Sequence, residues 1–372
     1  MDAYAIYNTP YKDLNLLHWG RFEAPEAYFA LRVGDRTVAF VSELEYGRCC
    51  AVGVFDAVYV WSDVRKELRQ RFQTGTFWQN FFQFLKEIYA IDRFVVPDDF
   101  PASLYAEVAP RVPMTFDTAF FERQRVVKTS AEISEIRKAC GLTAAVLKEA
   151  VRMLRNSAVE DGVLYLEEKP LTSERLRAMM EIYCLERGGV ANGTIVACGK
   201  DAAYPHCIGS GSLHAGETIV IDVFPYLKAS HFYGDMTRTI VKGHATSEQK
   251  RVYEAVFDCQ QVLLKRLRPG VLTSDLMTFA LRFFEDRGYG LKCTENGTEG
   301  FIHSVGHGIG LDIHEYPPVG SKPIALQPGM VITVEPGLYF PSIGGVRIED
   351  DVLITEDGCE VLTSCDKTLE IV

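Results

Sequence analysis

Residues 303–315 read His-Ser-Val-Gly-His-Gly-Ile-Gly-Leu-Asp-Ile-His-Glu and contain three of the eight histidines of the chain. The glycines at positions 306, 308 and 310 give this segment backbone freedom. Histidine is the commonest neutral metal ligand and the usual proton carrier near neutral pH. A single histidine of this kind is as often a hydrogen-bonded structural residue as a functional one. Three histidines in one short glycine-rich segment instead indicate a chemical site.

Four acidic residues interrupt or end strongly apolar stretches. They are Asp222 within Ile219–Phe224, Asp235 before Met236–Val241, Glu335 after Met330–Val334 and Glu349 within Val346–Ile354. Apolar runs of this length are typical of buried strands, where an unpaired carboxylate is strongly destabilised. Each acid taken alone is best interpreted as a salt bridge or a strand end that faces water. Four such acids beside three histidines favour one common cause, a pocket that binds cations.

The ligand types also limit the kind of cation. A carboxylate-rich pocket with one imidazole suits a pair of divalent ions such as manganese, cobalt, iron or zinc. In the stretch from 346 to 354, the period of two along a strand predicts that Arg347 and Glu349 point to one face. It places Ile348, Asp350 and Val352 on the opposite face.

Length and composition predict two domains and exclude several classes of protein. The chain has 372 residues, 47% of them apolar and 24% charged, which is ordinary for a soluble globular protein. No apolar run reaches the roughly 18–20 residues of a membrane span, and the first residues do not resemble a secretory signal. The net charge of −11 disfavours nucleic acid and anionic membranes as partners. The ten cysteines form no C-x-x-C pair, so we expect reduced thiols and a cytoplasmic protein.

Residues 1–122 are expected to form a small α/β domain. The predicted strands are 28–33, 37–41, 57–61 and 93–97, and the predicted helices are 76–88 and 101–108. The aromatic residues of this half are interpreted as core rather than as a ligand-binding group. Residues 126–372 are expected to form the second domain. Its predicted helices are 130–154, with Ser130 as the cap, 173–187, 247–266 and 274–287, and its polar segment 156–170 is predicted to be a loop.

Several separated motifs, in order, resemble those of the pita-bread metallopeptidases, the superfamily of methionine aminopeptidase, Xaa-Pro aminopeptidase and Xaa-Pro dipeptidase. The resemblance covers most of residues 128–355 and rests on Val127-Lys128, Tyr204-Pro205-His206, Ile221-Asp222, Asp235-Met236-Thr237-Arg238-Thr239, Gly306–Gly310, His314-Glu315, Glu335-Pro336-Gly337 and Arg347–Asp350. It implies an α+β protein. The expected C-terminal domain is a curved antiparallel sheet covered by helices, and the expected N-terminal domain is a smaller, creatinase-like α/β unit.

The resemblance also implies roles for individual residues. The five metal ligands would be Asp222, Asp235, His307, Glu335 and Glu349, and Glu335 would also be the catalytic base. Three histidines would be catalytic groups of the substrate pocket, namely His206, His303 and His314, and His206 and Arg347 would also bind substrate. Arg347 could orient Glu349 or meet a substrate carboxylate. A histidine four residues before the metal histidine, here His303, is typical of the proline-specific branch.

The implied activity is the hydrolysis of N-terminal Xaa-Pro bonds in short proline-containing peptides by a homodimer with two divalent metal ions. A metal-free creatinase-type hydrolase and a non-catalytic pita-bread binding protein are the alternatives, but proteins of both kinds lose metal ligands that this chain retains. One departure affects substrate preference. Asp235 follows Asp222 by thirteen positions, two more than is usual, and Phe224 stands where the family usually has glycine. The choice between dipeptidase and aminopeptidase, and the native metal, remain open.

Overall fold

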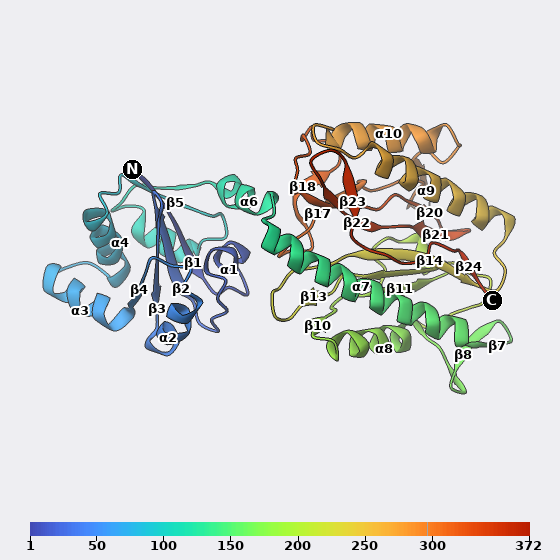
Figure 1. Ribbon diagram of the computed structural model, residues 1–372, viewed down its shortest axis with the longest axis horizontal. Coiled ribbons are helices and arrows are strands. Elements are labelled where there is room, and N and C mark those ends of the chain that lie inside the picture. Colours follow the sequence, from blue (N-terminus) through green and yellow to red (C-terminus); the bar gives the residue numbers. More distant parts are fainter. Residues whose placement is uncertain (296) are drawn as a thin grey trace. The chain divides into compact units, whose positions relative to one another are not determined.

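The computed structural model of the chain describes residues 1–295 and 297–372 (Figure 1). These residues divide into two compact units, Met1–Arg125 and Val126–Val372. None of the helices in the described residues is long and apolar enough to cross a membrane.

The first unit is built on one six-stranded sheet with the order β4-β3-β2-β1-β5-β6. Its strands are β1 (Asp2–Asn8), β2 (Tyr28–Val33), β3 (Arg36–Val41), β4 (Ala57–Val60), β5 (Arg93–Val96) and β6 (Met114–Phe116). β2 is antiparallel to both of its neighbours, and the other five strands run in one direction. The four strands expected from the sequence are present. β1 and β6 were missed because β1 is composed largely of alanine and tyrosine and β6 has only three residues.

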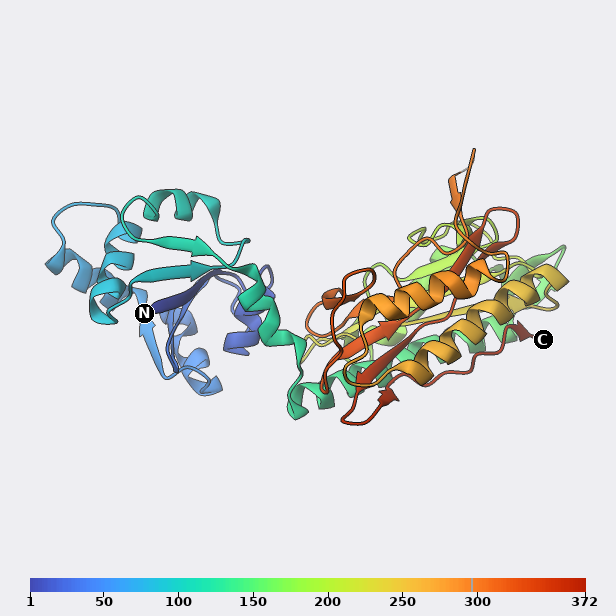
Figure 2. The ribbon, with the colours of Figure 1, turned by 90° about the horizontal axis from the view of Figure 1, so that it is seen from above.

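Helices cover both faces of this sheet (Figure 2). One face packs against α3 (Trp61–Arg71), α4 (Phe77–Ile88) and α5 (Ala102–Val108), and the other against α1 (Leu14–Gly20), α2 (Glu43–Val52) and α6 (Thr118–Val126). The alternation of side chains along β2 explains this layering, since Phe29 and Leu31 enter the first core whereas Tyr28 and Ala30 enter the second. Many aromatic residues are core residues as predicted, including Phe81, which is fully buried.

The second unit contains two main sheets. The first has the order β11-β12-β14-β24, with β11 Ile195–Cys198, β12 Ile219–Val223, β14 Met236–Lys242 and β24 Glu370–Ile371. The second has the order β18-β17-β19-β22-β23, with β17 Gly306–Gly308, β18 Glu315–Val319, β19 Val331–Val334, β22 Asp350–Ile354 and β23 Cys359–Val361. The hairpin of β20 (Gly337–Phe340) and β21 (Gly344–Arg347) continues beyond β19 and β22. Except for the β14–β24 pair, these strands are antiparallel.

Each sheet has its own pair of helices. α7 (Ser130–Asn156) and α8 (Ser173–Leu185) share a core with the first sheet, and α9 (Ser247–Arg266) and α10 (Thr273–Glu285) share one with the second. Figure 1 shows the two pairs on opposite sides of the strands. The shorter elements are β7 (Ala158–Glu160), β8 (Val163–Leu166), β9 (Lys169–Pro170), β10 (Gly189–Val190), β13 (Tyr226–Leu227), β15 (Lys292–Thr294), β16 (Gly297–Glu299) and the 3₁₀ turn Asp201–Ala203.

Three predictions for this unit are wrong. The predicted loop 156–170 contains the three-stranded sheet β7-β8-β9, in which β7 and β9 are short and exposed. The cap of α7 is Thr129 rather than Ser130, because Thr129 and Glu132 form a reciprocal capping box. The predicted strand 346–354 is divided between β21 and β22.

Candidate metal centre

Two glutamates lie opposite one another at a break in the hairpin formed by β19, β20, β21 and β22. On one side of the break Val334 is paired with Asp350, and on the other side Gly337 is paired with Arg347. Both pairs have the same register, which places Glu335 opposite Glu349 between them. Pro336 has no N–H to donate, so the ladder is interrupted there. Two carboxylates directly across a hairpin repel one another and favour a cation between them.

Three side chains form a compact set of potential ligand atoms. One donor atom from each of Asp235, His307 and Glu349 lies within 4.8 Å of the other two. His307 Nε2 is 3.8 Å from Asp235 Oδ2 and 3.4 Å from Glu335 Oε1. Asp222 completes the group of five, and all five residues line one cavity of about 1080 Å³.

The strands of the first sheet supply the two aspartates. Asp222 lies in β12 opposite Thr237 of β14, and Asp235 immediately precedes β14. The hydroxyl of Thr237 donates to Glu349 Oε2 at 2.6 Å, and the backbone N–H of Glu349 donates to the carbonyl of Thr237 at 3.1 Å. β14 thereby joins the aspartates to the broken hairpin.

The buried carboxylates lack sufficient partners within the protein. Oδ1 of Asp222 and Oδ1 of Asp235 are both buried without a hydrogen-bond partner among the described residues. Burial, reinforced by the negative charges of Glu349 and Asp222, raises the pKa of Asp235 well above its usual range. Burial also raises the pKa of Glu349, and the charge of Glu335 adds to the effect. Burial therefore favours the protonated form of both groups, and a divalent ion would favour the ionised form instead.

The histidine of this set has the charge state that a metal ligand requires. Desolvation in the cavity, together with the nearby His314 ring, lowers the pKa of His307 to about 4. The imidazole is therefore neutral near pH 7, so it can bind a metal ion without first losing a proton. Carboxylates with one neutral imidazole fit a divalent transition-metal ion, so the residues present suit the metal that the sequence implies.

Asp351 and Cys140 hold the backbone of Asp235 in place from behind the cavity. Its backbone N–H donates to Asp351 Oδ2 at 2.7 Å, and the thiol of Cys140 donates to the same oxygen at 3.2 Å. Asp351 and Cys140 are fully buried, and burial raises the pKa of Asp351 to about 7. These supporting residues were missed in the sequence, because nothing in their spacing relates position 140 to position 351.

Arg347 is held by an aspartate rather than by Glu349. Its Nη2 donates to Asp222 Oδ2 at 2.6 Å and its Nε donates to Thr237 Oγ1 at 3.1 Å. It reaches Glu349 only through Thr237, which itself donates to Glu349. Arg347 therefore contacts Asp222 directly and Glu349 through Thr237. The cause is the adjacency of β12 and β14, which brings Asp222 to the guanidinium.

The three catalytic histidines expected from the sequence line the cavity but differ in their contacts. His303 Nδ1 lies 2.7 Å from the carbonyl of Ser304 and Nε2 lies 2.9 Å from the hydroxyl of Tyr339, so both ring nitrogens are engaged. Within the described residues, no hydrogen bond involves the ring nitrogens of His206 or His314. The His314 ring meets the His307 ring at 4.4 Å between centroids. His206 and His314 thus have nitrogens available to a bound molecule.

The unusual hairpin between Asp222 and Asp235 contributes to the cavity wall. Phe224 lines the cavity, and a Cβ added to Gly193 would lie 3.4 Å from the Phe224 ring. β13, within this hairpin, pairs with β10. The hairpin between Asp222 on β12 and Asp235, just before β14, therefore contains a short ladder with β10.

Comparison with known proteins supports the same interpretation. A model of metallopeptidase family M24 matches residues 134–356. The Xaa-Pro dipeptidase of Pyrococcus furiosus is 35% identical over 247 residues, which are 66% of this chain and 65% of that protein. The match thus spans slightly less than two thirds of the length of that relative.

Solved structures share the whole architecture. The prolidase of Pyrococcus horikoshii OT3 is 27% identical with a TM-score of 0.79, over 99% of this chain and 95% of that one. The Xaa-Pro dipeptidase of Bacillus anthracis, at 24% identity, shows the fold alone, with a TM-score of 0.82 over 100% of this chain and 95% of that one. The predicted fold class, a pita-bread unit with a smaller N-terminal α/β unit, is confirmed. Because the family model covers more than half of the sequence, this chain belongs to metallopeptidase family M24.

Proposed function

We propose that the protein is a metallo-exopeptidase that hydrolyses the bond between an N-terminal residue and a following proline. Two divalent ions, drawn from manganese, cobalt, iron and zinc, would be held by Asp222, Asp235, His307, Glu335 and Glu349. The observation that carries the proposal is the convergence of these five side chains on one cavity, with buried carboxylate oxygens for which the described residues offer no hydrogen-bond partner. The similarity to Xaa-Pro dipeptidases supports the choice of substrate.

Divalent ions supply two effects at such a site, because they lower the pKa of water and polarise a carbonyl group. The remaining steps belong to the side chains. Glu335 would accept the proton of the attacking water. Burial raises the pKa of Glu335 to about 8, and the nearby Arg347 opposes that rise. Bound divalent ions would favour the ionised form of Glu335, which is the form that can accept a proton.

The leaving imino nitrogen of proline needs a proton. We assign its delivery to His314, which lies beside His307 and has available ring nitrogens. His303 is a less suitable donor, since it already contacts Ser304 and Tyr339. We assign it to positioning the substrate carbonyl through Tyr339. His206 and the Arg347 edge of the cavity would bind the polar parts of the substrate.

The shape of the cavity agrees with a short, partly apolar peptide. Its wall includes Ile195, Phe224, Ile302 and Pro318 beside the polar ligand set. An apolar wall of this kind can accommodate a proline ring and an apolar N-terminal side chain. We further propose a homodimer, as the family resemblance implies, and a cytoplasmic location, for which the ten free thiols are suited.

The test is hydrolysis of a peptide series by metal-stripped protein supplied with each of the four metals in turn. The series pairs Xaa-Pro and Xaa-Pro-Xaa peptides with the same peptides carrying alanine in place of proline. We expect turnover only with added metal and only with proline. Glu349→Ala should abolish it, and Glu356→Ala, at an exposed position, should not.

Each failure indicates a different alternative. A protein that binds no divalent ion yet hydrolyses a substrate would favour the creatinase-type hydrolase. A protein that binds metal but cleaves no peptide in the series would favour the binding protein.

A further inference from the structure

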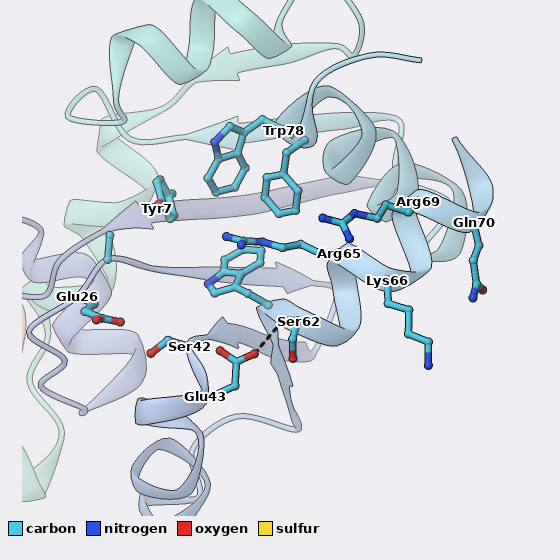
Figure 3. A pocket seen from close by; sticks show the side chains of 13 residues that line it. Tyr7, Glu26, Ser42, Glu43, Ser62, Arg65, Lys66, Arg69, Gln70 and Trp78 are labelled. Carbon is cyan, nitrogen blue, oxygen red and sulfur yellow. Dashed lines mark hydrogen bonds between the residues drawn. The ribbon is translucent and has the colours of Figure 1, made fainter. Parts of the chain in front are cut away.

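The first unit has a crevice of about 840 Å³ at one edge of its sheet (Figure 3). Tyr7 near the end of β1, Ser42 just after β3 and Trp61 just after β4 all line it. Helices α2, α3 and α4 contribute further side chains. Every lining residue lies within residues 7–78, so the crevice belongs to the first unit alone.

The position of the crevice in the fold is informative. Five of the six strands are parallel, and the crevice lies at their carboxyl edge. The lining residues come from the β1–β4 side of that edge and from the helices beside it. In open α/β sheets, ligands commonly bind in a crevice outside the carboxyl ends of the strands. A volume near 840 Å³ is also in the ordinary range of small-molecule pockets.

One wall of the crevice is aromatic. It consists of Tyr7, Trp61, Phe77 and Trp78. Tyr7 and Trp78 have ring centroids 4.6 Å apart, and Trp61 and Phe77 have centroids 5.7 Å apart. These four rings are only partly buried, unlike Phe81 behind them. The wall therefore offers flat apolar surface on which a planar group can stack.

Three cations project from the helix beside this wall. Arg65, Lys66 and Arg69 of α3 are exposed, and none of them forms an ion pair within residues 1–295 and 297–372. The Arg65 guanidinium lies over the Phe77 ring at 5.5 Å, which directs it into the crevice (Figure 3). By contrast, Arg71 at the end of the same helix is paired with Glu67.

The other side of the crevice provides hydrogen-bond acceptors. Figure 3 shows Glu26, Ser42 and Glu43 away from Arg69 and Lys66. One carboxylate oxygen of Glu43 accepts the N–H of Ser62 at 3.1 Å. Ser42 Oγ is buried and has no hydrogen-bond partner among the described residues. The crevice is thus polarised, with cations at α3 and acceptors at the start of α2.

We propose that this crevice binds a small anion built on an aromatic ring. The phosphate or carboxylate of the ligand lies against Arg65 and Arg69, and its ring stacks on the wall formed by Trp61 and Trp78. An amino or hydroxyl group of the ligand donates to Glu26 or Ser42. The site does not depend on the metal centre of the second unit or on peptidase activity. For Tyr7, Trp61, Phe77 and Trp78, this proposal departs from the interpretation of the aromatic residues as core.

Isothermal titration of the full-length protein tests this proposal. The compounds are AMP and indole-3-acetate, which have both a ring and an anion, adenosine and indole, which have the ring alone, and inorganic phosphate and acetate, which have the anion alone. We expect at least one of the first pair to bind below about 1 mM, and both kinds of fragment to bind about tenfold more weakly. Tighter binding of AMP would identify phosphate as the preferred anionic group, and tighter binding of indole-3-acetate would identify carboxylate. No measurable binding of either compound would overturn the proposal.

Variants locate the binding within the crevice. Arg65→Ala and Arg69→Ala should each weaken it by about tenfold, and Arg71→Ala, on the same helix but outside the crevice, should not. Both substituted residues are exposed, so the thermal unfolding of the variants should match that of the parent. Glu349→Ala, in the other unit, should bind the compound unchanged. Equal binding by Arg65→Ala, Arg69→Ala and the parent would overturn the assignment.

Discussion

Arg347 Nη2 and Asp222 Oδ2 are 2.6 Å apart, and both side chains are almost completely buried. The guanidinium also donates to Thr237 and to the hydroxyl of Tyr339, so it fixes three groups around the cavity. Charge-assisted bonds of this kind are strong and directional. Arg347 is therefore a positioning residue for Asp222, in addition to any contact with substrate.

Replacing Arg347 with glutamine should lower metal affinity and kcat/KM together, each by about 10–100-fold. Glutamine cannot hold Asp222, Thr237 and Tyr339 at the same time, so Asp222 loses its fixed orientation. Metal titration by calorimetry and steady-state kinetics at saturating metal separate the two effects. Arg152→Gln, which removes an exposed pair with Glu149, is the matched control. Unchanged metal affinity in the Arg347 variant would contradict a positioning role.

The metal-free protein should lose stability as the pH rises from 6.5 to 8. The pKa of Glu335 is raised to about 8 by burial, and the pKa of Asp351 is raised to about 7 by burial. A raised carboxyl pKa means that the folded state binds the proton more tightly. The stability that such a carboxyl group contributes is complete below its pKa in the unfolded protein. It is lost as the pH rises to the pKa of the group in the folded protein.

Two histidines have the opposite effect, but in a lower pH range. Desolvation lowers the pKa of His303 and of His307 to about 4, so their contribution to stability is gained between about 4 and 6.5. Above pH 6.5 only the loss from the carboxyls remains. We expect the unfolding free energy at pH 8 to be about 1–3 kcal/mol lower than at pH 6.5. The measurement is urea unfolding of chelator-treated protein at pH 6.5 and at pH 8. Added manganese should restore the unfolding free energy that is lost at pH 8. Equal stability at the two pH values would contradict this interpretation.

Glu349→Gln should have opposite effects on the metal-free and metal-loaded proteins. Glutamine removes a buried carboxyl that faces Glu335 and still accepts from Thr237, so the metal-free variant should be more stable than the parent at pH 8. The variant should also lose most of the stabilisation that metal gives the parent, because one ligand is gone. Melting temperatures with chelator and with manganese measure both effects. If metal stabilised the variant as much as the parent, Glu349 would not be a ligand.

The sequence revealed the acids because each stands in a stretch that is otherwise apolar. Asp222 in Ile219–Phe224 is conspicuous even without a structure, and the strand β12 forms there as expected. The partner of Arg347 could not be predicted in the same way. It depends on a contact across 125 positions, and periodicity along one strand describes only the direction of a side chain.

The break at Pro336 and the crevice of the first unit illustrate the same limit. Pro336 is visible in the sequence, but the interruption of the ladder that it causes depends on which strand lies beside it. The crevice combines residues from β1, from the loop before β2 and from α3, which share no regular spacing. Short exposed strands such as β7 and β9 are hard to distinguish from loops because they have no buried face.

A buried ion pair anchors the start of α7 to the segment that carries His314. Lys128 Nζ lies 2.5 Å from Glu315 Oε2, and both side chains are almost fully buried. Glu315 Oε1 also accepts the N–H groups of Leu311 and Asp312, so this carboxylate organises the turn before His314. Lys128→Met would leave the charge of Glu315 buried without its ammonium partner. Breaking a buried pair in this way costs about 3–5 kcal/mol.

We therefore expect Lys128→Met to unfold at lower urea concentration than the parent, with a loss of about that size. The double variant Lys128→Met, Glu315→Gln should recover part of the loss, because the carboxylate that lost its ammonium partner is also removed. Lys138→Met, which removes an exposed pair with Glu135, should change stability by less than about 1 kcal/mol. If the single and double variants were equally unstable, the loss would come from packing around Lys128 rather than from the missing ammonium partner of Glu315.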